Sequence, residues 1–100
     1  MAVDAIILHP TDNVATAVQD LKLGQKATVR LGRDLQYIEL TENVPYGHKF
    51  SLRTISQGEN ILKYGEVIGR ATRVIAAGSH AHVQNIESLR GRGDLQKEEI

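Results

Sequence analysis

The chain of 100 residues contains no cysteine and no tryptophan, and it has only one phenylalanine and three tyrosines. Without cysteine it cannot form a disulfide, use a thiolate nucleophile or offer a cysteine ligand to a metal ion. Aromatic residues make up 4% of the chain and hydrophobic residues 41%, so the core must be built from valine, isoleucine, leucine and alanine. The four histidines are therefore the first place to look for chemistry.

An excess of charge of either sign is also absent, because twelve lysines and arginines balance twelve acidic residues. A nucleic-acid-binding surface usually leaves a basic excess, and a polybasic membrane anchor would do the same. No apolar run is longer than that at residues 5–8, which is far shorter than the ~20 residues that cross a bilayer. The first residues lack the charged and apolar regions of a secretory signal. We therefore expect a cytoplasmic protein with no nucleic-acid and no membrane partner.

Alternation of apolar and polar residues predicts short strands through most of the chain. This period of two is found in three segments, at residues 27–31, 38–41 and 50–53. It places Ser51 on the polar face of its strand. Residues 5–9 form a short apolar run that Pro10 ends, which indicates one more strand.

Two further segments complete the prediction of the fold. Residues 67–75 are expected to form one long strand, in which Gly69 is typical of a bulge or a close crossing. Residues 14–21 fit a helix or a strand, and we favour a strand because the surrounding patterns are β. The sequence therefore predicts one all-β domain over residues 1–88, followed by a charged C-terminal tail over residues 89–100.

One turn pattern occurs three times, at Gly24, Gly58 and Gly78. Each glycine follows an apolar residue by three positions and precedes a strand-like run. Glycine adopts positive φ without steric cost, so it reverses the chain readily. The uneven spacing of the three glycines indicates a reused turn rather than a solenoid repeat.

Two histidines stand close together, at His80 and His82. Residues two apart on a strand point to the same face, about 6.6 Å apart. Two imidazoles so placed suit one metal ion or one anionic substrate, with Asn85 near enough to join the site. The alternative is a pair of solvated histidines on an edge strand.

A third histidine is followed by a lysine, at His48 and Lys49, just after Gly47. Together they offer a titratable base and a fixed cation for a carboxylate. The alternative is a polar strand edge without chemistry.

Four segments follow one another along the chain, at residues 12–15 (Asp-Asn-Val-Ala), 47–50 (Gly-His-Lys-Phe), 63–69 (Lys-Tyr-Gly-Glu-Val-Ile-Gly) and 77–82 (Ala-Gly-Ser-His-Ala-His). In this order, and with Asn85 behind them, they resemble the N-terminal domain of the altronate/galactarate dehydratase family. The resemblance covers residues 5–94 and implies a SAF-type β-clip fold. Such a domain occurs either fused ahead of a large catalytic domain or as a separate small subunit.

The resemblance also implies a function. It indicates the small subunit of an altronate-type sugar-acid dehydratase, which eliminates water from a hydroxy acid together with a large catalytic subunit and a divalent metal ion, with iron expected. The small subunit of sulfolactate sulfo-lyase shares the Gly-His-Lys-Phe pattern and is the alternative. An alternative of another class is a non-catalytic SAF-type interaction or carbohydrate-binding module. Exposed strand edges further predict a homodimer when the chain is isolated.

Within this hypothesis each candidate residue receives a role. His80 and His82 are metal ligands, and the large subunit, the substrate or water supplies the remaining ligands. His48 and Lys49 are catalytic, with Lys49 and Asn85 contacting the substrate. The chain departs from the family at one position, because Gln84 stands where the pattern His-x-His-x-His-Asn has its third histidine.

Overall fold

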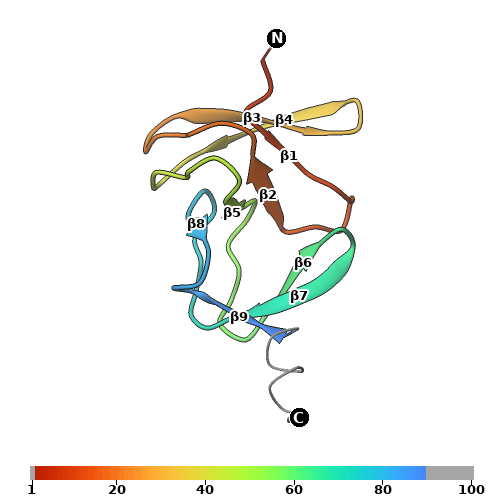
Figure 1. Cartoon of the computed structure of the whole chain (residues 1–100), viewed down its shortest axis with the longest axis vertical. Helices are drawn as coiled ribbons and strands as arrows, with labels where there is room; N and C mark the ends of the chain where they lie inside the picture. The colour runs from red at the N-terminus through yellow and green to blue at the C-terminus, as the bar shows by residue number, and fades with distance from the viewer. Residues whose placement is uncertain (1, 90–100) are drawn as a thin grey trace.

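The computed structural model describes residues 2–89, which form nine strands in two sheets (Figure 1). The larger sheet has the order β4-β3-β1-β2-β5-β8, with β1 (Ala5–Ile6), β2 (Val14–Ala17), β3 (Lys26–Leu31), β4 (Asp34–Glu39), β5 (Lys49–Ser51) and β8 (His80–Ala81). The smaller sheet has the order β6-β7-β9, with β6 (Asn60–Lys63), β7 (Glu66–Ala71) and β9 (Ile86–Ser88). The all-β prediction is confirmed.

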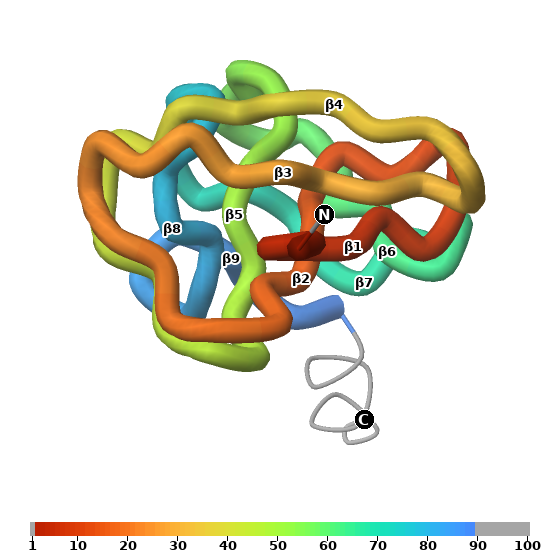
Figure 2. The backbone as a smooth tube through the Cα atoms, turned by 90° about the horizontal axis from the view of Figure 1, so that it is seen from above, coloured from red at the N-terminus to blue at the C-terminus, as the bar shows by residue number. Residues whose placement is uncertain are grey.

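The pairing within the sheets is antiparallel except between β1 and β3. Figure 2 shows β3 and β4 running side by side, with β5 and β8 passing close to each other beneath them. Over residues 2–89 there is no helix of the length and apolar character that a membrane crossing requires. The predicted tail at residues 89–100 lies, apart from its first residue, outside the described residues.

Four turns of one kind connect these strands, at Gly24, Gly47, Gly58 and Gly78, whose φ angles are +85°, +83°, +86° and +83°. In each turn the residue after the glycine donates its N–H to the carbonyl two residues before the glycine, at 3.0 Å. This hydrogen bond, with positive φ at the third position, defines a type II turn. Three of the four turns were expected from the sequence, and Gly47 is the additional member.

The apolar residues that precede these turns bond to each other in pairs. Leu21 bridges to Val44 and Ile55 bridges to Ile75, each pair through two backbone hydrogen bonds of 2.8 or 2.9 Å. All four side chains are at most 1% exposed. Each bridge closes a unit made of two glycine turns and the hairpin between them. The reused turn therefore reflects two similar halves of one domain.

The two hairpins end in different tight turns. The β3–β4 hairpin turns at Gly32, where a side chain would meet open space. The β6–β7 hairpin turns at Tyr64 and Gly65, which both have positive φ. The carboxylate of Asp12 accepts the N–H groups of both residues, at 3.1 and 2.9 Å. Among the hydrogen bonds described for residues 2–89, a distant side chain thus holds the β6–β7 turn but not the β3–β4 turn.

The core consists of two clusters that meet along β2 and β5. One cluster contains Phe50 and lies under the larger sheet, while the other contains Val14, Ile55 and Ile61. Ser51 was predicted on a polar face, and this prediction is wrong. It is fully buried, and its hydroxyl donates to the carbonyl of Ala76, which satisfies the polar group inside the core.

The strand prediction for residues 14–17 is confirmed. The strand predicted over residues 67–75 is correct up to Ala71 and wrong for the residues that follow. β7 stops at Ala71, because Ile75 already belongs to the bridge before the Gly78 turn. The apolar run at residues 5–9 forms a strand only over Ala5–Ile6.

Gly69 shows both features that its place in the strand suggested. The register between β6 and β7 shifts beside it, and a Cβ at Gly69 would lie 2.7 Å from the carbonyl oxygen of Glu87. The glycine therefore lets β9 approach β7 closely.

A comparison of Gly78 with Gly24 tests the role of the tightest of these contacts. A Cβ at Gly78 would lie 2.1 Å from the carbonyl oxygen of Glu39, whereas one at Gly24 would meet nothing within 4 Å. Both φ angles are positive, so Gly24→Ala carries the backbone strain alone, about 1 kcal/mol. Gly78→Ala should lower the free energy of unfolding by at least about 3 kcal/mol more. Denaturant unfolding measures both, and equal losses would contradict the packing assigned to Gly78.

Candidate functional site

Three of the four histidines meet where β5 pairs with β8. His48 immediately precedes β5, His80 lies on β8, and His82 follows β8. The antiparallel register places Phe50 opposite His80, which brings all three imidazoles to the same face of the pair. The ring centroids of His48 lie 5.1 Å from those of His80 and 4.2 Å from those of His82, and the His80–His82 separation is 5.4 Å.

The three rings offer nitrogen atoms that lie within 4.8 Å of one another. Nδ1 of His48 and Nε2 of His80 are 2.9 Å apart, so one of them donates a hydrogen bond to the other. The rings are half-buried, which leaves one side of the cluster open to solvent. Such an arrangement is typical of a metal-binding or proton-transferring cluster, and we call it the histidine cluster (His48, His80 and His82).

The remaining nitrogen of His80 is also engaged. The side-chain amide of Gln84 donates to its Nδ1 at 3.2 Å. Gln84 is the residue that replaces the third histidine of the family pattern. In this chain it therefore contacts an imidazole of the cluster from the side opposite His48.

The backbone that carries His80 and His82 is held by buried or acidic side chains. Asn85 is 6% exposed, accepts the N–H of His82 and donates to the carbonyl of His80, both at 2.9 Å. A carboxylate oxygen of Glu42 accepts the N–H of His80 at 2.8 Å. The predicted contact of Asn85 with substrate stays a prediction, because both of these hydrogen bonds go to the backbone of the cluster.

Burial and like charge act on the pKa values of His80 and His82 in the same direction. The pKa of His80 is lowered first by burial, then by the charges of His48 and His82. The pKa of His82 is lowered by burial, then by the charges of His48 and Lys49. Both shifts favour the neutral imidazole, which is the form that binds a metal ion.

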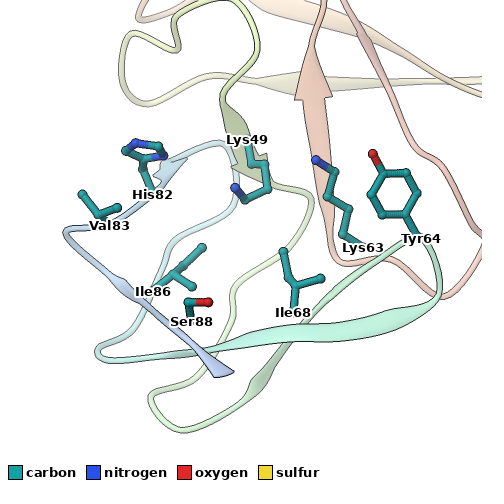
Figure 3. Close-up of a pocket in the computed structure, with 8 residues that line it drawn as sticks. All are labelled: Lys49, Lys63, Tyr64, Ile68, His82, Val83, Ile86 and Ser88. Carbon is teal, nitrogen blue, oxygen red and sulfur yellow. The ribbon is translucent and has the colours of Figure 1, made fainter. Parts of the chain in front are cut away.

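A cavity of about 340 Å³ lies beside the cluster and shares His82 with it. Figure 3 shows Lys49 between His82 and Lys63, with the ring of Tyr64 on the far side of Lys63. The residues that line the cavity are Lys49, Lys63, Tyr64, Ile68, His82, Val83, Ile86 and Ser88. Burial lowers the pKa of Lys49, and the nearby charge of Lys63 lowers it further. We call this cavity the lysine pocket.

The fold thus brings His48, Lys49, His80 and His82 together, and the sequence hypothesis requires them to lie close to one another. His9 lies elsewhere, with its ring against Gly65. Lys63 and Tyr64 were not predicted as site residues, although their segment carried part of the family resemblance. Only the pairing of β6 with β7, which turns at Tyr64, brings them to the pocket.

Comparisons with known proteins show the family of the chain. Residues 3–89 match the family model described as the altronate/galactarate dehydratase SAF domain. The chain therefore belongs to the altronate/galactarate dehydratase SAF domain family. The fold is accordingly that of a small SAF-type β domain found in dehydratases and lyases.

Its relatives fall into two groups. The chain is 45% identical to an altronate dehydratase of Escherichia coli over 80% of its own length, but it spans only 15% of that relative. It is 47% identical to a galactarate dehydratase (L-threo-forming) of the same organism, over 74% of the chain and 13% of the relative. It is 32% identical to a (2R)-sulfolactate sulfo-lyase subunit alpha of Chromohalobacter salexigens, over 90% of the chain and 99% of the relative.

Histidine titration tests the electrostatic coupling within the cluster. In His48→Ala the pKa values of His80 and His82 should both rise, because a neighbouring positive charge is removed. In His9→Ala they should not move. Ring-proton NMR against pH measures both, and unchanged values in His48→Ala would show that the three rings do not interact.

The same pKa shifts set the sign of the pH dependence of stability. Both folded-state pKa values lie below the ordinary value near 6.5, so the unfolded chain binds more protons as the pH falls through that value. The free energy of unfolding should therefore fall below about pH 6.5, and less so in His82→Ala. Denaturant midpoints between pH 5 and 8 give the measurement, and a stability that rises on acidification would contradict the shifts.

Proposed function

We propose that this chain is the small subunit of an altronate-type dehydratase and that its histidine cluster holds a divalent metal ion, iron in the first instance. The observation that carries the proposal is the convergence of three imidazoles that the family's motifs supply. The reaction class comes from the dehydratase relatives. The subunit organisation comes from the sulfo-lyase relative, whose name describes a subunit and which the chain covers almost completely.

The donor set fits such an ion. Imidazole nitrogen is a ligand for iron, zinc, nickel and copper. Two nitrogens bound at about 2.1 Å to one ion, at right angles, lie about 3 Å apart. The 2.9 Å between Nδ1 of His48 and Nε2 of His80 is close to this separation. Gln84 contacts Nδ1 of His80, and Asn85 fixes the backbone that carries His80 and His82.

Dehydration of a hydroxy acid breaks two bonds. A base removes the proton beside the carboxylate, the electron pair forms a double bond, and the hydroxyl leaves as water after it receives a proton. A bound divalent ion would stabilise the carboxylate and the leaving oxygen. On this chain Lys49 would neutralise the carboxylate, and His48 is the candidate for carrying a proton.

The open side of the cluster supports a shared site. Three imidazoles do not close a coordination sphere, so the partner subunit, the substrate or water completes it. The dehydratase relatives are about seven times longer than the matched segment, which leaves most of the catalytic protein to the proposed large subunit.

A second candidate function is that of a sulfolactate sulfo-lyase small subunit. It is favoured by one observation, the full-length match to a stand-alone subunit alpha. Turnover of altronate, galactarate and (2R)-sulfolactate by the complex that co-purifies with this chain distinguishes the two.

Substitution of the cluster tests whether the chain contributes to chemistry. His80→Ala and His82→Ala should each reduce turnover of the complex by at least about 100-fold and lower its metal content, because each removes a ligand. His9→Ala, outside the cluster, should change turnover less than about twofold. Subunit association is measured in parallel by analytical ultracentrifugation.

The outcome for His48→Ala assigns its role. Lost turnover with less bound metal makes His48 a third ligand, whereas lost turnover with unchanged metal makes it a proton carrier. Unchanged turnover in all three cluster variants, with the complex intact, would refute the catalytic proposal and leave a docking module.

A further inference from the structure

The lysine pocket carries a separate inference, because two cations share a cavity there. Lys49 comes from β5 and Lys63 from the end of β6, and Figure 3 shows both side chains reaching into the same space. Among residues 2–89, those that line this cavity include no aspartate or glutamate. Two like charges in one half-buried cavity repel each other unless an anion lies between them.

The walls of the pocket strengthen that effect. Ile68 and Ile86 line it with apolar surface, so a charge inside is screened less than on an open surface. A fixed pair of ammonium groups over an apolar wall favours a compact oxyanion over a neutral sugar. His82 lines the pocket and also belongs to the histidine cluster, so the two sites adjoin at this residue.

Tyr64 contacts the side chain of Lys63, although its own backbone conformation is strained. Tyr64 has φ +60° and is the one non-glycine residue with positive φ in the described part of the chain. Such a conformation costs a tyrosine about 1 kcal/mol or more, and glycine would adopt it without strain. The tyrosine is compensated by contact: the ammonium of Lys63 lies 5.1 Å from the centre of its ring, within the range of a cation–π interaction.

We propose that Lys49 and Lys63 form an oxyanion site that holds one end of the substrate, a carboxylate or a sulfonate, while the rest of the molecule extends past His82 to the histidine cluster. Tyr64 positions Lys63 in this site. The inference rests on the proposed function for the identity of the acid, but binding of the anion does not depend on turnover. It assigns to this chain the recognition of an acid with a charged end group.

The test is a chemical-shift titration of the 100-residue chain. Galactarate carries a carboxylate at each end, and galactitol keeps the same internal hydroxyl groups but has an uncharged CH2OH group in place of each carboxylate. We expect galactarate to shift amide signals near Lys49, Lys63 and Tyr64, and galactitol to leave them unmoved. The second arm compares (2R)-sulfolactate, which carries a carboxylate and a sulfonate, with lactate, which lacks the sulfonate. Tighter binding of sulfolactate than of lactate assigns the site to a sulfonate, and equal binding assigns it to a carboxylate.

Matched variants locate the site. Lys63→Met should weaken galactarate binding at least about tenfold, and Lys22→Met, which removes an exposed lysine from the Gly24 turn, should change it less than about twofold. Tyr64→Gly relieves the strained φ and removes the ring, so it should weaken binding several-fold without loss of folding. Circular dichroism and thermal unfolding confirm that each variant is folded.

Several outcomes would overturn the inference. They are no binding of either acid, equal binding of galactarate and galactitol, or equal effects of the Lys63 and Lys22 variants. Failure of the proposed function looks different, because loss of metal binding or turnover with intact galactarate binding removes the metal site and keeps the oxyanion site. If metal binding persists and Lys63→Met binds galactarate normally, the oxyanion site is refuted and the metal site remains.

Discussion

The site depends on the tight contact between the Gly78 turn and the segment that follows β4. The N–H of Gly78 bonds to Ser51, its carbonyl accepts the N–H of Thr41, and the hydroxyls of Thr41 and Ser79 bond at 2.7 Å. Glu42 then accepts the N–H of His80. Because β8 begins directly after this turn, these contacts fix its register on β5. The meeting of the three imidazoles is a consequence of that register.

The internal similarity of the two halves explains where the site lies. Each half ends in a glycine turn, at Gly47 and Gly78, and each turn leads into a strand of the central pair, β5 or β8. The histidines follow these two turns, so the cluster forms where the ends of the halves meet. The positions after Gly24 and Gly58 carry Gln25 and Glu59, whose side chains accept backbone N–H groups of their own turns.

The sequence was sufficient for the local features of the fold and insufficient for its long-range pairings. Alternation identified β3, the surrounding β patterns favoured a strand at β2, and the turn glycines identified most of the reversals, because these signals are set by neighbouring residues. The partnership of His80 with His82 is local in the same sense. Ser51 was misplaced because its burial comes from Ala76 across the fold, and Lys63 was missed because β6 reaches the pocket only through tertiary pairing.

The two hairpin turns differ in their distance from the candidate site. The turn at Tyr64 is held by hydrogen bonds to Asp12 and borders the lysine pocket. The turn at Gly32 is its equivalent in the other half of the domain, and a side chain at Gly32 would meet open space. Chain added at the Gly32 turn would extend into solvent, away from both the imidazoles and the ammonium groups. That tip is accordingly the natural point for attaching a fluorophore or an affinity handle when the protein is followed in solution.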